Sequence, residues 1–255
     1  MSDNLFIVWA AVFGAMIGSF LNVCIYRVPR KMSVARPPSS CPACGRRLAW
    51  FENLPIVGYL ALRGRCRTCH AEIRPRYVII EALTASMFAL AAWHYGQTPL
   101  FWDRMTLGCV LIVLFAIDLE HQLLPNVITL PFIVVGFVFS LFVEPGWQSS
   151  LVGILVGGGS LLAMFYLWLW LRKQEALGMG DPKMLAMVGA FLGWKLTILT
   201  LVLASFSGSI VGVALIAARR ARMQSLIPFG CFLAVGPAIA ATVGQPLIDW
   251  YLSFF

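Results

Sequence analysis

The chain has 255 residues, of which 60% are hydrophobic and only 12% are charged, and its mean hydropathy is +0.84. A soluble domain is about half apolar and about a quarter charged. The chain therefore has too few polar residues to cover a globule in water, which excludes an ordinary soluble protein. The composition predicts an all-α polytopic membrane protein.

The N-terminal apolar run is not typical of a cleaved signal peptide. Asp3 precedes the run, and no lysine or arginine stands before it. A signal peptide has a positively charged n-region and a small-residue cleavage site. We therefore expect residues 5–26 to form a membrane-spanning helix that is retained.

Several apolar windows are long enough to cross a bilayer, which takes roughly 20 apolar residues. They are residues 5–26, 77–95, 100–117, 126–143, 151–171, 196–218 and 229–251. A shorter apolar stretch, residues 183–194, lies between the fifth and the sixth of these windows. Including this stretch gives eight crossings, and leaving it out gives seven.

Positive charge is concentrated in the loop that follows the first window. Of the 19 Lys and Arg residues, 11 lie within residues 27–76. The positive-inside rule places such a loop in the cytoplasm, and alternation from there puts Asp118 at the cytoplasmic end of its span. The basic cluster at residues 219–222 is also cytoplasmic only if residues 183–194 cross. The charges thus favour eight spans with both termini outside.

The net charge of +8 follows from this topology and from contact with anionic lipid head groups. Nucleic-acid binding would require a basic face with stacking aromatic side chains outside the membrane. In the loop of residues 27–76 only Trp50, Phe51 and Tyr59 are available for stacking. We therefore expect anionic lipid as a partner and no nucleic acid.

Glycine pairs with GxxxG spacing recur in the apolar windows. They are Gly14/Gly18, Gly153/Gly157, Gly189/Gly193 and Gly208/Gly212. A nucleotide-binding loop would follow a strand, and no strand-like segment precedes any of these pairs. Small residues at this spacing allow two helices to approach closely, so we interpret the pairs as helix-packing sites.

Four of the seven cysteines form two Cys-x-x-Cys pairs, CPACG at 41–45 and CRTCH at 66–70. Each pair is typical of a thiolate knuckle, and two knuckles form a closed tetrahedral zinc site. Gly45 permits the backbone turn of the first knuckle. Such a site has no open coordination position, so we expect it to act in folding and docking. The predicted ligands are Cys41, Cys44, Cys66 and Cys69.

Two other interpretations of these cysteines stay open. The pairs could form disulfides, although the cytoplasm keeps thiols reduced. One pair could be a redox-active dithiol, although two matched pairs are more typical of a structural site. The remaining cysteines, Cys24, Cys109 and Cys231, lie in or beside apolar windows and are interpreted as small core residues.

Two aspartates stand where an apolar window meets the cytoplasm. Asp118 lies in FAIDLEHQLLPN, and Asp181 lies in GMGDPKM. An ionisable group at such depth is by default a functional-site hypothesis. The alternative for each aspartate is a structural ion pair, Asp118 with His121 and Asp181 with Lys183.

The residues around Asp181 predict an irregular turn that opens a short helix. Gly178 and Gly180 permit backbone geometries that other residues resist, and Pro182 is tolerated at a helix start. Irregular backbone at membrane depth persists only where it is buried or lines water. We therefore expect Asp181 to face a hydrated cleft, with Gly178, Gly180 and Lys183 supporting the loop.

Two such carboxyl groups could hydrolyse a peptide bond as an aspartic protease does. They would share one proton, so that the ionised group activates water and the neutral group polarises the scissile carbonyl. Two charges about 4 Å apart at an effective dielectric of about 20 interact by ~4 kcal/mol, which is enough to hold one proton between them. A polytopic transporter or channel, with the carboxylates as proton or cation sites, is the alternative from another class. A zinc-organised membrane scaffold is a third interpretation.

Taken together, the motifs resemble those of the type IV prepilin leader peptidase/N-methyltransferase family, whose members are inner-membrane aspartic proteases. The resemblance rests on the two cysteine pairs and on segments along most of the chain. These segments are GSFLNVCIYRVP at 18–29, FENLPIVGYL at 51–60, RPRYVIIEALTA at 74–85, DLEHQLLPN at 118–126, GMGDPKM at 178–184 and IPFGCFLA at 227–234. The Gly-x-Gly-Asp motif also resembles presenilin-type proteases, but these lack the cysteine-bearing loop.

The resemblance implies an enzyme that removes the short basic leader from type IV prepilins or from the pseudopilins of type II secretion. Cleavage would take place at the cytoplasmic face of the bacterial inner membrane. The enzyme would then methylate the new N-terminus with S-adenosylmethionine. Asp118 and Asp181 match the catalytic aspartates of the family, and the four cysteines of the two pairs match its tetracysteine site.

We expect three parts along the chain. Residues 1–27 would form the first transmembrane helix, and residues 28–76 would form a cytoplasmic tetracysteine zinc-binding domain. Residues 77–255 would form a transmembrane helical aspartic protease core.

The methyl-donor site has no recognisable motif in this sequence. Neither a known S-adenosylmethionine fold nor a glycine loop is evident, so residues for this site cannot be assigned by pattern. Glu52 and Glu81 are the candidates. Glu81 is alternatively a buried partner of a neighbouring arginine, Arg74 or Arg76.

Overall fold

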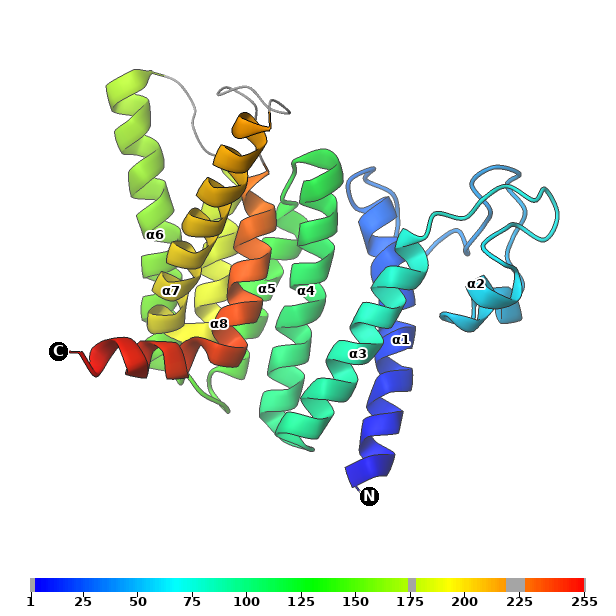
Figure 1. Cartoon of the computed structure of the whole chain (residues 1–255), viewed down its shortest axis with the longest axis horizontal. Coiled ribbons are helices and arrows are strands. Elements are labelled where there is room, and N and C mark those ends of the chain that lie inside the picture. The colour runs from blue at the N-terminus through cyan, green and yellow to red at the C-terminus, as the bar shows by residue number, and fades with distance from the viewer. Residues whose placement is uncertain (1–2, 174–177, 219–227, 255) are drawn as a thin grey trace. The chain divides into compact units, whose positions relative to one another are not determined.

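The computed structural model of the protein describes residues 3–173, 178–218 and 228–254. Within them the chain forms α-helices and one short 3-10 helix, and its only β-structure is a pair of isolated bridges. The elements, drawn in Figure 1, are α1 (Asp3–Arg27), η1 (Trp50–Asn53), α2 (Val57–Ala61), α3 (Arg76–Tyr95), α4 (Pro99–His121), α5 (Asn126–Phe139), α6 (Trp147–Arg172), α7 (Asp181–Ala217) and α8 (Phe229–Leu252). The predicted all-α fold is confirmed.

Six of the described helices are long and apolar enough to cross a membrane, namely α1, α3, α4, α6, α7 and α8. The helix α5 has 14 residues, which is fewer than the roughly 20 that a full crossing takes. The protein is therefore a multi-pass membrane protein, as its composition predicts. Eight crossings would require α5 and two separate arms of α7 to cross, and that number stays a prediction.

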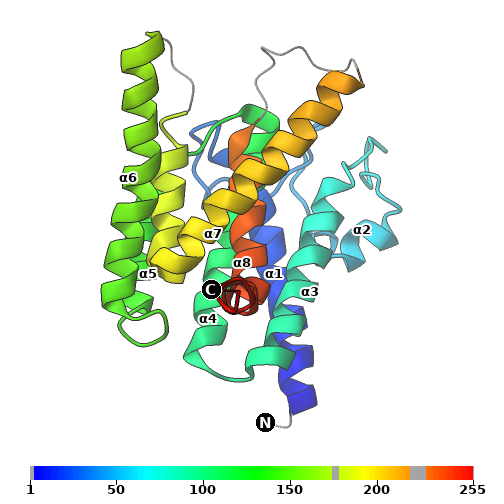
Figure 2. The same ribbon diagram turned by 60° about the vertical axis from the view of Figure 1, so that its left-hand side comes forward.

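The helix α7 consists of two arms that meet at Gly193, where the backbone leaves the helical region (φ 73°, ψ 172°). Figure 2 shows the chain reversing its direction here, from the yellow first arm to the orange second arm. The arms, residues 181–192 and 194–217, correspond to the two apolar windows expected at 183–194 and 196–218. Glycine suits this turn because a positive φ is unfavourable for residues that have a Cβ atom.

The first arm of α7 lies in the core of the C-terminal part of the chain. All of its residues except Lys183 are buried, and Met184, Leu185, Met187 and Val188 have no exposed surface. A helix that is apolar all round is stable where other helices surround it. Both α5 and α6 contact α7, so neighbouring helices cover this short arm.

The chain divides into two compact units, residues 1–113 and 114–255, and the boundary falls inside α4. The first unit contains α1, the loop with η1 and α2, α3 and most of α4. Its helices pack around an aromatic cluster in which Phe101 lies edge to face against both Phe6 and Phe88. The second unit contains the end of α4 and the helices α5 to α8.

Glycine contacts hold the helices of each unit together. In the first unit, a Cβ atom at Gly14 of α1 would lie 2.7 Å from the Phe88 Cβ of α3. In the second unit, Gly153 of α6 faces Gly189 of α7, and a Cβ atom on either would collide with the backbone of the other. The predicted role in helix packing is confirmed for the pairs that begin at Gly14 and Gly153, whereas Gly193 forms the reversal of α7.

Gly189→Ala is expected to destabilise the second unit, because the added methyl group meets backbone atoms at Gly153 that cannot move aside. Overpacking of this kind costs about 1–3 kcal/mol, so the midpoint of thermal unfolding of the purified protein should fall. Gly159→Ala is the matched control, since nothing lies within 4 Å of its added Cβ atom. Equal stability of the two variants would contradict the close contact between α6 and α7.

Candidate active site and metal centre

Asp118 lies in the last turn of α4, and only 5% of the residue is exposed. Cys231, at the start of α8, lies close enough to interact with its carboxylate. The Cys231 N–H donates to the Pro228 carbonyl oxygen at 3.3 Å, and its thiol donates to the Phe115 carbonyl oxygen at 3.7 Å. The first N–H groups of a helix have no partner within the helix and attract negative charge. The N-terminus of α8 therefore gives this carboxylate a polar place among apolar helices.

Gly230 lets α8 approach the Asp118 carboxylate closely. A Cβ atom at residue 230 would lie 2.7 Å from the Asp118 Oδ2 and 2.9 Å from its Cγ, which is closer than non-bonded atoms pack. The Oδ2 atom is buried and has no hydrogen-bond partner among the described residues. Because an unsatisfied buried acceptor is costly, this oxygen is suited to take a hydrogen bond from an incoming water or substrate.

Asp181 is the first residue of α7, and only 7% of it is exposed. Gly180 takes the N-cap position and Pro182 follows in the first turn, as the motif predicts. The Asp181 N–H donates to the Gly178 carbonyl oxygen at 3.2 Å. The two glycines thus form the turn that places the Asp181 carboxylate at a helix N-terminus, where negative charge is favoured.

The structure brings Asp118 and Asp181 into one site of the second unit. Their carboxyl groups are close enough to interact electrostatically. Leu124 packs against the start of α7 and against the start of α8. A Cβ atom at Gly180 would lie 2.6 Å from the Leu124 Cβ, and a Cβ atom at Gly230 would lie 3.2 Å from the Leu124 Cδ1. Leu124 therefore sets the spacing between three segments that are far apart in the sequence.

Lys183 supports the first turn of α7 through a neighbouring helix. Its Nζ donates to the side-chain oxygen of Asn126, the first residue of α5, at 2.9 Å in an exposed position. Among the described residues Lys183 is thus bonded to Asn126 rather than to Asp181, the partner in the structural alternative. Glu120, two residues after Asp118, is exposed and does not share its buried environment.

Three residues of this site, Leu124, Gly230 and Cys231, were not predicted from the sequence. Cys231 was expected to be a core residue; it is buried, and it also contacts the Asp118 carboxylate. A partial signal exists, because Gly230 follows Pro228 at the start of an apolar window. A glycine at a helix start permits close approach of another group, but the sequence does not say which group approaches.

The four cysteines of the two Cys-x-x-Cys pairs converge in the loop between α1 and α3. Their sulfur atoms all lie within 4.8 Å of one another, and the Cys41 and Cys69 sulfurs are 3.8 Å apart. Four thiolates at about 2.3 Å from a tetrahedral zinc ion would be about 3.8 Å apart. The described cysteines are free rather than joined in disulfides. The geometry of the cluster is therefore compatible with zinc.

The two halves of the cluster repeat one backbone pattern. The Gly45 N–H donates to the Cys41 carbonyl oxygen at 2.9 Å, and the His70 N–H donates to that of Cys66 at 3.0 Å. Gly45 and His70 both have a positive φ, 71° and 55° respectively. Histidine is among the residues that tolerate this region best after glycine, which explains how the second knuckle forms without a glycine.

Neighbouring groups shift the pKa values of two of the cysteines, Cys66 and Cys69, in opposite directions. Hydrogen bonds from the backbone N–H groups of Cys69 and Thr68, with smaller contributions from nearby sulfurs, lower the pKa of Cys66 to about 6. The Ala71 N–H acts in the same direction on Cys69, but desolvation and the neighbouring sulfurs outweigh it and raise the pKa of Cys69 to about 11. Four sulfurs this close cannot all ionise unless a cation lies among them. A divalent ion would satisfy that requirement.

Glu52 and Glu81, the candidates for the methyl-donor site, are both buried in the first unit. The Glu52 carboxylate accepts hydrogen bonds from Arg46 and from the Ala49 N–H. The Glu81 carboxylate accepts the Ile56 N–H at 2.7 Å. Glu81 of α3 thus holds the chain at the start of α2, a role that the sequence did not indicate.

Comparison with known proteins identifies the family of this chain. Residues 12–95 match the bacterial peptidase A24 N-terminal domain, and residues 105–213 match the type IV leader peptidase family. A Pseudomonas aeruginosa protein named prepilin leader peptidase/N-methyltransferase is 35% identical over 98% of this chain and 94% of its own length. The chain belongs to the type IV leader peptidase family. The resemblance seen in the sequence motifs is thereby confirmed.

Two further members of the leader peptidase family bear the same name. The protein of Aeromonas hydrophila is 35% identical over 96% of this chain and 93% of its own length. The protein of Myxococcus xanthus is 40% identical over 84% of this chain and 64% of its own length. No solved structure gives a significant match. Within this chain, the segment that matches the leader peptidase family contains both Asp118 and Asp181.

Leu124→Ala is expected to lower the stability of the second unit, because Leu124 is 8% exposed and packs between Gly180 and Gly230. Truncation of a buried leucine costs about 2–5 kcal/mol. The measurement is thermal unfolding of the purified protein. Leu123→Ala is the matched control, since its neighbour Leu123 is 47% exposed. An equal effect of the two substitutions would show that Leu124 does not hold the segments together.

Proposed function

We propose that this member of the leader peptidase family removes the basic leader from type IV prepilins or type II secretion pseudopilins and then N-methylates the new N-terminus. The observation that carries the cleavage step is the pair of buried, interacting carboxyl groups of Asp118 and Asp181. The names of the relatives, prepilin leader peptidase/N-methyltransferase, indicate the substrate class and the second reaction.

Asp118 and Asp181 would share one proton during cleavage, because two ionised carboxylates in one buried site repel each other. The ionised carboxylate removes a proton from water, and the water oxygen attacks the scissile carbonyl carbon. The protonated carboxyl group donates a hydrogen bond to the carbonyl oxygen, and a proton then passes to the leaving amine. The unpartnered Oδ2 of Asp118 is suited to bind the attacking water.

Other residues would hold the carboxyl groups in place without reacting. Gly178 and Gly180 form the turn before Asp181, and Lys183 fixes the following helical turn through its bond to α5. Gly230 keeps α8 against Asp118. Such support affects the rate strongly, because a misplacement of about 1 Å can cost a hundredfold.

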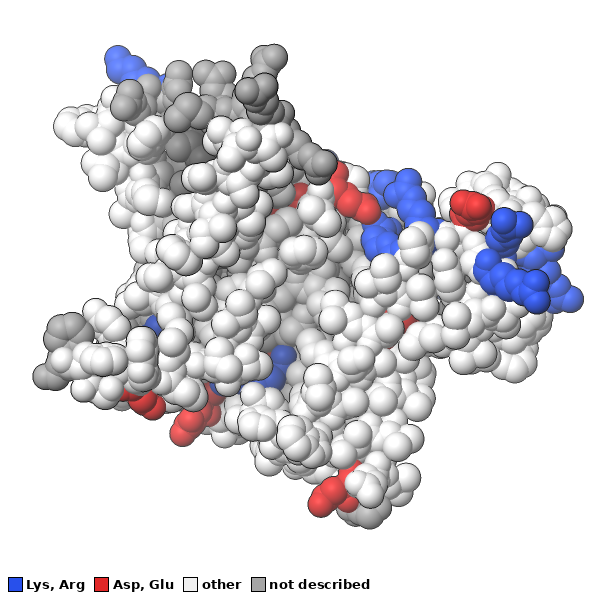
Figure 3. Space-filling model, in the orientation of Figure 1, with Lys and Arg blue, Asp and Glu red and all other residues white. Residues whose placement is uncertain are grey.

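We place the active site at the cytoplasmic face of the bacterial inner membrane. Positive charge in the first unit is concentrated in the loop between α1 and α3, and Figure 3 shows Lys and Arg side chains gathered there. The positive-inside rule assigns that loop to the cytoplasm. Alternation of the spans from this loop puts the end of α4 on the same side, and Asp118 lies at that end.

Methylation would use S-adenosylmethionine, the donor expected for an N-methyltransferase. When bound, the donor supplies a methyl group: the S–CH3 bond breaks with its electrons left on sulfur, an N–CH3 bond forms from the lone pair of the new N-terminal amine, and the amine proton passes to solvent. The residues of this chain would bind the donor and orient the amine toward it.

Zinc bound by Cys41, Cys44, Cys66 and Cys69 would organise the loop between α1 and α3. Four thiolates complete a tetrahedral site and leave no position open for substrate, so the ion would stabilise the fold rather than react. Among the apolar residues of this loop, residues 28–75, the structure buries Cys41 and Cys66 and leaves the others at least partly exposed. A metal ion would replace the hydrophobic core that this segment lacks.

Asp118→Asn and Asp181→Asn are each expected to slow prepilin cleavage at least about a hundredfold, because an amide cannot exchange the catalytic proton. Purified full-length protein is incubated with a prepilin, and the products are identified by mass spectrometry. Glu120→Gln, at the same end of α4 but exposed, is the control and should cleave normally. Parental rates in either asparagine variant would exclude the dyad, and a parent protein that cleaves no prepilin would favour a transporter.

Purified protein is expected to contain about one zinc ion per chain, and the double variant Cys41→Ser, Cys66→Ser to contain almost none, because each knuckle loses a ligand. Metal content is measured by elemental analysis, and removal of the ion should make residues 28–75 sensitive to protease. Cys109→Ser in α4 is the control and should retain zinc. A metal-free parent protein would refute the assignment.

A further inference from the structure

The loop between α1 and α3 leaves one apolar face uncovered in the first unit. Trp50 of η1, Leu54, and Val57 and Leu60 of α2 are between 43% and 79% exposed. We call these four residues the apolar face. Large apolar side chains gathered on one surface mark a contact with a protein or with a membrane. The apolar face therefore requires an occupant.

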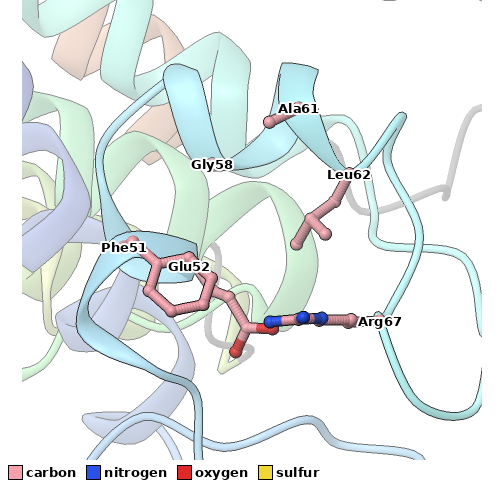
Figure 4. A pocket seen from close by; sticks show the side chains of 6 residues that line it. All are labelled: Phe51, Glu52, Gly58, Ala61, Leu62 and Arg67. Carbon is pink, nitrogen blue, oxygen red and sulfur yellow. The ribbon is translucent and has the colours of Figure 1, made fainter.

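The charge of this segment is turned away from the apolar face. Glu52 is the only charged residue at positions 50–62. Its side chain is 1% exposed and accepts hydrogen bonds from Arg46. Figure 4 shows the Glu52 carboxylate beside the Arg67 guanidinium in a hollow of the loop. The hollow is lined by Phe51, Glu52, Gly58, Ala61, Leu62 and Arg67. The apolar face lies outside this lining and carries no charge.

A hydrogen bond fixes the depth of this segment beside a membrane span. The Ile56 N–H, immediately before α2, donates to the Glu81 carboxylate of α3 at 2.7 Å. The helix α3 has 20 residues, which at about 1.5 Å per residue cover about 30 Å, the thickness of a hydrocarbon core. Arg76, its first residue, therefore lies near the membrane surface. Glu81 follows five residues later, or about 7.5 Å deeper, so the start of α2 is held below the head groups.

The backbone of the segment is suited to an apolar environment, because its N–H groups already have partners. Several of them donate to carbonyl oxygens within the segment, namely those of Leu54, Val57, Gly58 and Leu60. The Ile56 N–H donates to Glu81, and Pro55 has no N–H. Irregular backbone persists at membrane depth only where its polar groups are satisfied within the protein. The segment meets this condition at the turn before α2.

Basic side chains follow the segment directly. Arg63 and Arg65 come after α2, and both are exposed. Figure 3 shows Lys and Arg side chains gathered on this loop, next to surface without charged groups. Basic residues beside an apolar segment attract anionic lipid head groups. The same charges would repel the basic leader of a prepilin, so they favour lipid over substrate as the occupant.

We propose that residues 50–61 insert into the membrane interface on the side of the basic loop. The apolar face lies against lipid acyl chains, and Arg63 and Arg65 contact anionic phospholipid head groups. The segment is far shorter than the roughly 20 residues of a crossing, so it lies within one leaflet. Glu81 ties it to α3. The loop that carries the four cysteines is thereby held against the membrane surface, whichever reaction the protein catalyses.

The test measures the fluorescence of Trp50 in the purified full-length protein, placed in lipid nanodiscs of phosphatidylglycerol and phosphatidylcholine. The signal of Trp50 is the difference between the parent and Trp50→Phe. Bromine on the acyl chains is expected to lower this signal at least about twofold, because bromine quenches an indole ring only on contact and interfacial segments insert about 5–10 Å. Acrylamide in the water should have little effect. Brominated phosphatidylcholine alone should quench Trp50 less, and equal quenching would overturn the head-group contact of the arginines.

Two further variants, each made in the Trp50→Phe protein, complete the test, and thermal unfolding shows that each is folded. Leu60→Trp places a second probe on the apolar face and should be quenched by the brominated lipid. Glu72→Trp is the matched control: the Glu72 side chain is 84% exposed and lies outside the segment, so acrylamide should quench this probe. If acrylamide rather than brominated lipid quenches Trp50 and the probe at position 60, the apolar face is in water and the proposal is overturned. Protection from acrylamide only after addition of a prepilin would overturn it as well, because the substrate would then be the occupant.

Discussion

Burial of negative charge is the constraint on which the second unit depends. A carboxylate removed from water is tolerated only where hydrogen-bond donors or helix N-termini face it. Asp118 meets the start of α8, and Asp181 is itself the first residue of α7. Both helix starts must therefore lie beside the end of α4. The same arrangement that makes the two charges tolerable also brings them together, so stability and proposed chemistry have a common physical origin.

Glycine residues serve three different purposes in the second unit. Gly180 and Gly230 leave room for Leu124 and for the Asp118 carboxylate, because neither has a Cβ atom to occupy that space. Gly193 takes a positive φ and reverses α7, which buries the first arm among its neighbours. Gly153 and Gly189 bring α6 and α7 into backbone contact. Each position needs glycine for its own reason, namely space, backbone conformation or helix approach.

The loop between α1 and α3 is organised by other interactions. Few of its apolar residues are buried, so the hydrophobic effect contributes little to its stability. Polar contacts take that place: Arg27 donates to the carbonyl oxygens of Ser33 and Pro37, Arg46 pairs with Glu52, and the four sulfurs form a cluster suited to a cation. The shape of this segment therefore depends on hydrogen bonds, ion pairs and the cysteine cluster rather than on an apolar core.

The sequence by itself determined the membrane class, the all-helical fold, the family and the positions of the cysteine and aspartate motifs. These features are local or compositional: apolar windows, Cys-x-x-Cys spacing, and glycines beside Asp181 can each be recognised without knowing what lies opposite them. Only the tertiary structure decided that Gly230 and Cys231 lie against Asp118, that Leu124 packs between Gly180 and Gly230, and that Lys183 bonds to Asn126. Such contacts join segments that are distant along the chain, and no local pattern encodes which of them meet, because helix packing and the reversal at Gly193 select the partners.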